Sequence, residues 1–211
     1  QLATRQPFAS IDLHNNSGLN PHYGCVANLE QPFLHLARLF SRVIVYIERP
    51  RGVQSVAMAR LCPAVTVECG RIGTPEGVAH AMEFIEACLS LSHFPAHDVL
   101  PRDVELLHTV AVVKVPPGVS FSFDGSAAQI CFRPGLDHFN FSPLPAGAVL
   151  ATTHSSPAAK LEVIGGHTCH DRASWFDYAD GEIRLARPAI PAMLTPDVPA
   201  VRADCLCYLM E

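Results

Sequence analysis

The sequence predicts an α/β fold in which a mixed, mainly parallel sheet with flanking helices is followed by a smaller, mainly antiparallel β module. From residue 1 to about 93, apolar strands alternate with amphipathic helices, which is typical of a parallel sheet covered by helices. Short alternating runs separated by Gly, Pro, Asp and Ser follow, and they are typical of antiparallel strands. A chain of 211 residues can bury a real core, and we expect two domains, 1–97 and 98–211.

The first strand, helix and strand of the α/β part have clear boundaries. The segment "FASIDLH" (8–14) has the pattern of a strand, and "RVIVYI" (42–47) is a second one. Between them, "EQPFLHLARLFSR" (30–42) has helical periodicity. The apolar residues expected on its buried face are Phe33, Leu36, Ala37 and Phe40.

A further strand and a longer helix follow. The β-branched segment "PAVTVECG" (63–70) predicts a strand that ends near Glu68. The segment "TPEGVAHAMEFIEACLSLS" (74–92) predicts a helix, with Thr74 as its N-cap and Pro75 in its first turn. Its apolar stripe consists of Val78, Met82, Ile85 and Leu89.

Composition excludes several classes of function. The formal charge is −5 and no run of basic residues is present, so we expect no nucleic-acid partner. The longest apolar runs are much shorter than the roughly 20 residues that span a bilayer, and "QLATRQPFAS" does not have the pattern of a signal peptide. We therefore expect a cytoplasmic protein without membrane association, and free, buried thiols at most of its eight cysteines.

Polar residues gather where the first strand ends. In open α/β sheets, ligands bind at the carboxyl ends of the strands, and both His14 and Glu68 are placed there. A histidine can bind zinc through a neutral imidazole, and a carboxylate beside it can accept a proton from water. An ordinary polar strand end is an equally good explanation of His14. Asp12 is not expected to share the role of His14.

Two segments together resemble a known family. "DLHNNSG" (12–18), followed at this distance by "VTVECG" (65–70), is similar to the succinylglutamate desuccinylase/aspartoacylase family, a branch of the zinc carboxypeptidase superfamily. The resemblance implies zinc as cofactor, His14 as a zinc ligand and Glu68 as the general base. It also implies hydrolysis of the C–N bond of a small acyl-amide substrate, such as an N-acyl amino acid or a peptide-like amide.

The chain departs from the pattern of this family in one large respect. The family has a His-x-x-Glu motif, which supplies two further zinc ligands, well before the Asp-Leu-His segment, and only 13 residues precede His14 here. The arginine that follows that motif is missing for the same reason. The resemblance therefore implies that 1–97 is the C-terminal half of a catalytic domain and 98–211 is an accessory module. We expect this piece to be inactive alone and to associate with an N-terminal half or with itself.

Other motifs offer weaker candidates for ligands. His80 and Glu83 match His-x-x-Glu, but they lie within a predicted helix, where exposed pairs of this kind are common. "HTCH" (167–170) and "HFPAH" (93–97) complete no known zinc spacing, so we interpret both as surface loops. Trp175 and Tyr178 either line the entrance to the site or pack in the core of the β module.

Several residues near the predicted site could bind substrate. Asn15, Asn16 and Ser17 can supply hydrogen bonds beside His14, and Gly18 and Gly24 allow the backbone to approach a ligand closely. His22 and Tyr23 line the pocket or pack their own loop. Arg71 could bind a substrate carboxylate, although an exposed arginine is the commoner outcome. Three other arginines are similarly placed: Arg49, Arg51 and Arg60.

Two other functions remain compatible with the sequence. A relative that kept the fold without a complete metal site would bind a ligand but not hydrolyse it. A structural or interaction module would do neither. Charge and composition do not separate these alternatives from the hydrolase, whereas a metal bound at His14 would.

Overall fold

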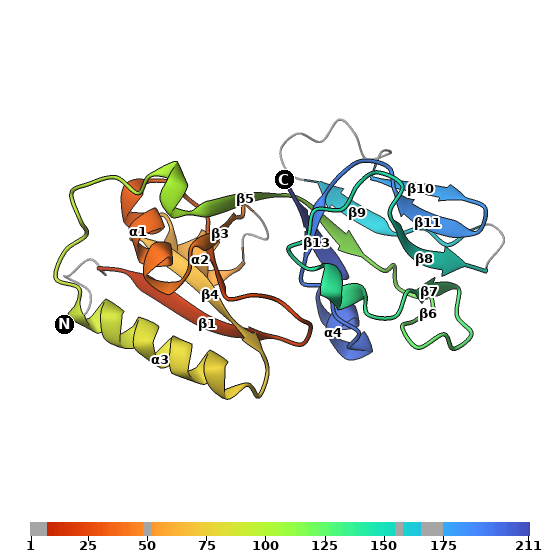
Figure 1. Ribbon diagram of the computed structural model, residues 1–211, viewed down its shortest axis with the longest axis horizontal. Helices are drawn as coiled ribbons and strands as arrows, with labels where there is room; N and C mark the ends of the chain where they lie inside the picture. The colour runs from red at the N-terminus through yellow and green to blue at the C-terminus, as the bar shows by residue number, and fades with distance from the viewer. Residues whose placement is uncertain (1–7, 49–51, 155–157, 166–174) are drawn as a thin grey trace. The chain divides into compact units, whose positions relative to one another are not determined.

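The computed structural model describes residues 8–48, 52–154, 158–165 and 175–211. It divides into two compact units (Figure 1). Unit 1 contains the chain up to Asn16 together with Pro21–His108, and unit 2 contains Ser17–Asn20 and Thr109–Glu211. The long strand β5 (Glu105–Lys114) begins in unit 1 and ends in unit 2.

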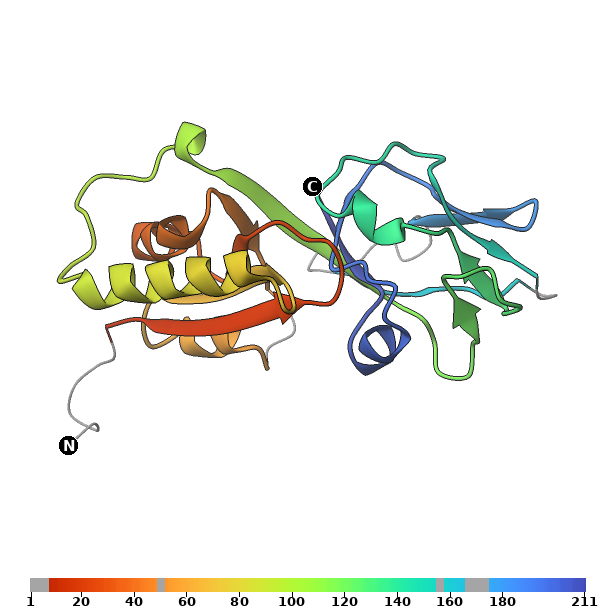
Figure 2. The ribbon, with the colours of Figure 1, turned by 60° about the horizontal axis from the view of Figure 1, so that its bottom comes forward.

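Unit 1 is an α/β unit, as the sequence predicts. The strand order is β1-β4-β2-β3-β5, in which β1–β4, β2–β3 and β3–β5 are parallel and β2–β4 is antiparallel. The sheet is therefore mixed and mainly parallel, with helices packed against it (Figure 2). Its elements before β5 are β1 (Ser10–Asn16), β2 (Tyr23–Val26), α1 (Gln31–Phe40), β3 (Val43–Tyr46), α2 (Gln54–Met58), β4 (Ala64–Arg71), α3 (Pro75–Ser90) and the short 3₁₀ helix η2 (Pro101–Asp103).

Helix α1 packs on the sheet through the face that its sequence predicts. Phe33, Leu36, Ala37 and Phe40 are all buried in the core of unit 1. Gly24 on β2 makes this packing close, because a Cβ atom there would lie 3.3 Å from Cβ of Ala37. Gly24 therefore allows α1 to pack closely on β2. This contact with the helix accounts for the glycine without a ligand.

Helix α3 is turned differently from the expectation. The core of unit 1 receives Phe84, with Ala81 and Cys88 packed at its margin, whereas Val78, Met82 and Leu89 are exposed. The reason lies at the start of the helix, where a Cβ on Gly77 would lie 2.2 Å from the carbonyl oxygen of Cys69. Only glycine permits so close an approach, so this side of the helix faces β4. Thr74 occupies the N-cap position, but its hydroxyl donates to the carbonyl oxygen of Arg71 instead of capping α3.

Unit 2 is mainly antiparallel, in agreement with the predicted β module. One group of strands has the order β9-β5-β13-β12, and a second sheet has the order β10-β11-β8-β7-β6. Only the β6–β7 pair is parallel among the described strand pairs of this unit. Its elements after β5 are β6 (Phe121–Ser122), β7 (Ile130–Phe132), the 3₁₀ helix η3 (Leu136–Phe139), β8 (Val149–Thr153), β9 (Glu162–Gly165), β10 (Phe176–Ala179), β11 (Glu182–Leu185), β12 (Ile190–Ala192), α4 (Val198–Ala203) and β13 (Cys207–Met210).

Unit 2 has its own hydrophobic core. Trp175 is buried in it, and Tyr178 packs against it while its hydroxyl accepts a hydrogen bond from the Leu161 amide. Both aromatic residues therefore belong to the core of this unit. Cys205 and Cys207 are buried free thiols, as the sequence predicts for most of the cysteines. No helix in the described part of the chain is long and apolar enough to cross a membrane.

A four-residue segment between β1 and β2, Ser17–Asn20, packs as part of unit 2. Nδ2 of Asn140 donates to the carbonyl oxygen of Leu19 at 2.8 Å. A Cβ atom on Gly18 would lie 2.0 Å from the carbonyl oxygen of Leu194, so no other residue fits at this position without a shift of the backbone. We call Ser17–Asn20 the strap. Its glycine is required by contact with the protein and not with a ligand.

Candidate functional site

His14 and Glu68 face each other on neighbouring strands. β1 and β4 run parallel with His14 and Glu68 in register, and directly opposed residues place their side chains on the same face of a sheet. Nδ1 of His14 lies 4.0 Å from Oε1 of Glu68. The His14 side chain is 52% exposed and that of Glu68 only 7%, so the imidazole lies between solvent and a buried carboxylate.

The Glu68 carboxylate is fixed by Asn16. Nδ2 of Asn16 donates to Oε2 of Glu68 at 2.9 Å, and both residues are buried. Oε1 is the oxygen on the side of His14. A buried carboxylate influences its neighbours, since burial and, to a smaller extent, the Glu68 charge raise the pKa of the Cys69 thiol and hold that of Cys25 well above its usual range.

Asp12 orients the imidazole of His14. Oδ2 of Asp12 lies 2.9 Å from Nε2 of His14. A carboxylate can only accept a hydrogen bond, so Nε2 carries the proton, and the lone pair of the neutral ring is on Nδ1, the nitrogen nearer to Glu68. Histidines that bind metals commonly have their second nitrogen held in this way. The alternation of side chains along a strand predicts this contact, because residues two apart lie on the same face.

His14 offers one nitrogen atom that could bind a metal ion. His14 is suitable as one ligand, because its Nδ1 lone pair points away from Asp12. Nowhere in residues 8–48, 52–154, 158–165 and 175–211 do three or more His, Cys, Asp or Glu side chains form a group that could hold a metal ion. A structural zinc site normally has four protein ligands, so the described residues do not hold zinc by themselves.

The predicted substrate-binding residues have different surroundings. Asn15 is exposed in the irregular part of β1, between His14 and Asn16. Asn16 is 3% exposed, and its Oδ1 has no hydrogen-bond partner among the described residues, although its Nδ2 is bonded to Glu68. Arg71 is exposed at the end of β4, opposite Asn16 in the strand register.

Tyr23 and His22 point to different environments. Tyr23 is buried on β2, in register with Glu68, and so lies on the same face of the sheet as this carboxylate. The ring of His22 stacks on that of His80 with centroids 4.6 Å apart. Nε2 of His80 lies 2.8 Å from the carbonyl oxygen of Phe40, at the end of α1. His22 and His80 thus form a cluster with Phe40, and burial, followed by the charge of His80, lowers the pKa of His22.

Some weaker candidates can be placed and others cannot. Arg60 is exposed after α2. Arg49, Arg51 and the "HTCH" segment lie outside the described residues.

The architecture can be compared with proteins of known structure. Murine aminoacylase 3 matches 97% of this chain with a TM-score of 0.54 and 14% identity. The succinylglutamate desuccinylase from Chromobacterium violaceum matches 96% with a TM-score of 0.52 and 13% identity. The succinylglutamate desuccinylase/aspartoacylase from Rhodobacter sphaeroides matches 96% with a TM-score of 0.51 and 13% identity. The chain has the fold of the succinylglutamate desuccinylase/aspartoacylase family. The resemblance that the "DLHNNSG" and "VTVECG" segments predict is thus confirmed by the fold.

The match covers only part of each structural neighbour. The chain spans 62%, 54% and 58% of the aminoacylase, the Chromobacterium desuccinylase and the Rhodobacter protein, respectively. No family model matches the sequence, and no curated protein sequence matches it significantly. The family fold is therefore recognised here through structure, over little more than half the length of these proteins.

Proposed function

We propose that this chain supplies the general base and one metal ligand of a zinc-dependent deacylase. The observation that carries the proposal is the paired geometry of His14 and Glu68, with Nδ1 and Oε1 4.0 Å apart. The deacylase fold of the structural neighbours supports it. In the complete protein, His14 would bind zinc together with two ligands from outside the described residues.

The chemistry of the chain's own residues follows from this arrangement. Zinc, when bound, would polarise the amide carbonyl and make the attacking water more acidic. Oε1 of Glu68 would accept a proton from that water and then deliver it to the leaving amine. Asn16 keeps Oε2 occupied, so the exchange of the proton takes place at a single oxygen that is held in position.

We propose a small acyl amide, such as an N-acyl amino acid, as the substrate. Tyr23 lies on the same face of the sheet as Glu68, and it would form one wall of the site. Arg71, at the end of β4, would bind the carboxylate of an acidic substrate, because its guanidinium group can donate two parallel hydrogen bonds. Which acyl group is removed depends on residues outside this arrangement.

The decisive experiment uses the protein expressed from its complete reading frame. In Glu68→Gln we expect hydrolysis of N-acetylated amino acids to fall by about 10²- to 10⁴-fold, with zinc content unchanged. His14→Ala should lose zinc as well as activity, as measured by elemental analysis. Glu83→Gln, an exposed residue on α3, is the control and should behave like the wild type.

Two outcomes would contradict the proposal. Full turnover in Glu68→Gln would exclude this carboxylate as the base. A wild-type protein that binds N-acyl amino acids without zinc and without turnover would support instead the relative that kept the fold for ligand binding alone.

A further inference from the structure

The pairing of β1 with β4 changes register directly after His14 and Glu68. These two residues lie opposite each other, but Asn16, two positions after His14, lies opposite Arg71, three positions after Glu68. β4 therefore has one residue more than β1 over this stretch, which is a β-bulge. Figures 1 and 2 show the ends of the two strands side by side, next to the start of α3. Bulges beside a functional site can redirect a side chain.

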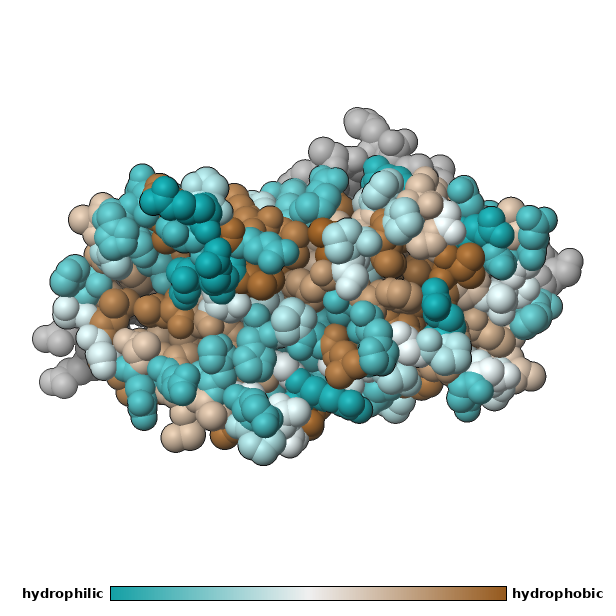
Figure 3. Space-filling model, viewed as in Figure 1, coloured by the Kyte–Doolittle hydropathy of each residue, from teal (hydrophilic) through white to brown (hydrophobic). Residues whose placement is uncertain are grey.

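A glycine with a positive φ lies in the bulge. Gly70 is buried in β4 and has a φ of +76°. Glycine adopts this left-handed conformation without the steric cost that a Cβ atom brings. The chain then passes into an exposed turn, in which Gly73 has a φ of +83°. Figure 3 shows hydrophilic residues among hydrophobic ones along the edge of unit 1 where Figure 1 draws the start of α3.

Two groups of this segment hold one residue of β1. The Ile72 amide donates a hydrogen bond to the carbonyl oxygen of Asn16 at 3.0 Å. The Glu68 carboxylate accepts a hydrogen bond from Nδ2 of Asn16 at 2.9 Å. Asn16 is therefore held through its backbone and through its side chain by residues on either side of Gly70. In an unshifted register, Asn16 would lie opposite Gly70 instead of Arg71.

We propose that Gly70 is a positioning residue for the Glu68 carboxylate. Its left-handed conformation forms the bulge, the bulge lets Ile72 hold the backbone of Asn16, and Asn16 holds Oε2 of Glu68. We call these four residues, Asn16, Glu68, Gly70 and Ile72, the clasp. The clasp stands on the geometry of unit 1 alone, whereas its effect on turnover rests on the proposed function.

The first test measures the clasp in the 211-residue chain, without zinc or substrate. Gly70→Ala should disturb the bulge, because alanine is disfavoured at positive φ. We expect hydrogen exchange at the Ile72 amide to become about tenfold faster or more, since this amide loses its acceptor. The NMR signals of the Asn16 side-chain amide should move towards those of a free amide. Gly70→Asn should largely preserve the wild-type signals, because asparagine tolerates the left-handed conformation.

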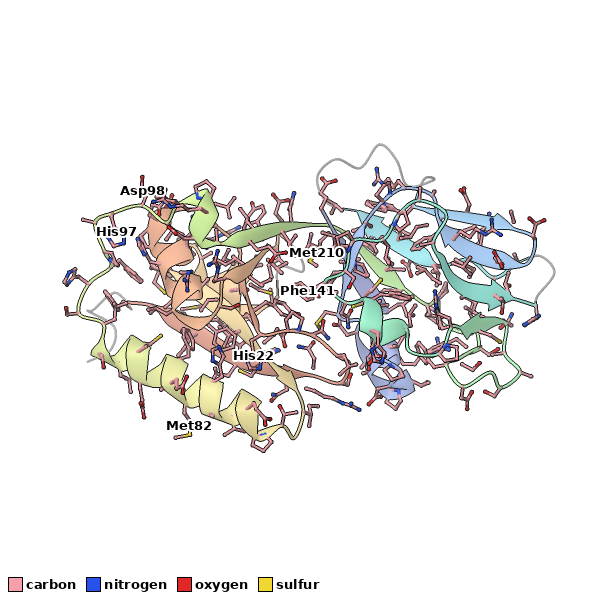
Figure 4. The ribbon with its side chains drawn as sticks, viewed as in Figure 1. His22, Met82, His97, Asp98, Phe141 and Met210 are labelled. Atoms are coloured by element: carbon pink, nitrogen blue, oxygen red, sulfur yellow. The ribbon has the colours of Figure 1, made fainter. Side chains whose placement is uncertain are left out.

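Gly73→Ala is the matched control. Gly73 has a similar φ, and no atom of the described residues lies within 4 Å of a Cβ atom built there. Gly73→Ala therefore carries a similar backbone cost to Gly70→Ala, but it should leave the signals of the Asn16 side-chain amide unchanged. The methyl group of Met82, which is 56% exposed and points outward from α3 in Figure 4, reports on the helix. Its signal should stay in place in both variants.

The second test uses the protein expressed from its complete reading frame. Gly70→Ala should lower kcat for N-acetylated amino acids about tenfold or more, with KM and zinc content nearly unchanged, because Glu68 keeps its charge and loses its position. Gly73→Ala should keep the wild-type kcat. Asn16→Ala and the double variant with Gly70→Ala should have the same kcat, because both substitutions act through one contact.

Several outcomes would overturn the proposal. One is a clasp that Gly70→Ala leaves intact, and another is an equal change of the Asn16 signals in Gly73→Ala. If Gly70→Ala does not fold, a folded Gly70→Asn chain that has lost the Asn16 signals of the wild type would overturn it as well. A disturbed clasp with unchanged kcat would exclude the role in turnover. A wild-type protein without hydrolysis would contradict the proposed function, while the NMR comparison would still decide the clasp.

Discussion

Asn16 gives the two oxygens of Glu68 different environments. Its amide donates to Oε2, whereas Oε1 lies towards His14. A carboxylate held by a buried amide cannot rotate freely, so its base oxygen stays in one place. Oδ1 of the same amide is buried and has no hydrogen-bond partner among the described residues. Burying an unpaired polar atom is unfavourable, so this position calls for an explanation beyond packing.

The hydrogen bond between Asn16 and Glu68 should be measurable as stability. In Asn16→Ala the buried Oε2 loses a donor, and hydrogen bonds to charged groups contribute about 1.5–3 kcal/mol. We expect the free energy of unfolding of the 211-residue chain, from urea denaturation, to fall by about this amount. Asn15→Ala is the neighbouring control and should change it by less than about 0.5 kcal/mol, because Asn15 is exposed. Equal effects of the two substitutions would show that the bond is not formed.

The sequence alone could name His14 and Glu68 as candidates, because each lies near the end of an apolar strand and in a segment that resembles the family. The sequence could not predict the hydrogen bond between Asn16 and Glu68. That contact depends on the register of β1 and β4 and on the irregularity of β1 between His14 and Asn16. The contact of Asp12 with His14 could be predicted from the alternation of side chains along a strand, and the structure shows this contact.

At the level of elements, α1 and α3 show two ways in which a helix meets the same sheet. α1 buries one continuous apolar face. α3 approaches through Gly77 and Phe84, and Phe84 packs edge-on against Phe40 with ring centroids 5.3 Å apart. The tightest contact determines how α3 is turned, and the longer apolar row is left outside.

Two substitutions on α3 distinguish its rows. Phe84→Ala removes a ring that is 2% exposed, and large-to-small changes of this kind in a core cost about 3–5 kcal/mol. Leu89→Ala removes a side chain that is 82% exposed and should cost less than about 0.5 kcal/mol in the 211-residue chain. Urea denaturation of both variants measures the difference. A large loss in Leu89→Ala would mean that the stripe is the buried row.

The stacked pair of His22 and His80 predicts a dependence of stability on pH. The pKa of His22 is lowered in the folded protein, so the unfolded chain binds the proton more tightly. The contribution of His22 to the free energy of unfolding is constant above its ordinary pKa of about 6.5. It becomes increasingly unfavourable as the pH falls from there to the lowered pKa of the folded state, and it levels off below that value. We expect His22→Gln to flatten the loss of stability below about pH 6.5, as followed by thermal denaturation. The exposed His93→Gln is the control, and an identical pH profile in the two variants would refute the role of the pair.

The elements themselves were largely predictable, because their apolar periods are strong. The strands β1, β3 and β4 and the helices α1 and α3 lie where the patterns predict them. The orientation of α3 was not predictable, because its two rows are both apolar and only the contact of Gly77 with Cys69 decides between them. The periodicity of a sequence predicts that a helix forms. Which of its faces is buried depends on the contacts that it makes with the sheet.

At the scale of the whole molecule, two cores form separately within one chain. The core of unit 1 contains residues from the sheet and from α1 and α3, and that of unit 2 contains residues from β5 onwards. A change in the pattern of apolar residues along a sequence can show that the architecture changes from α/β to β. It carries no information about a short segment such as the strap, which has neither a long apolar run nor a regular period.

The strap has a consequence for how such a protein can be divided or recombined. Because Ser17–Asn20 lies between two segments of unit 1, the chain passes between the units three times and not once. A single crossover between related genes near residue 108 would join a new β module to an old strap, whose backbone was shaped for a different Leu194 and Asn140. We therefore expect an exchanged β module to be tolerated only when the strap is exchanged with it, although the strap follows β1 directly and the main part of unit 2 begins some ninety positions later, at Thr109.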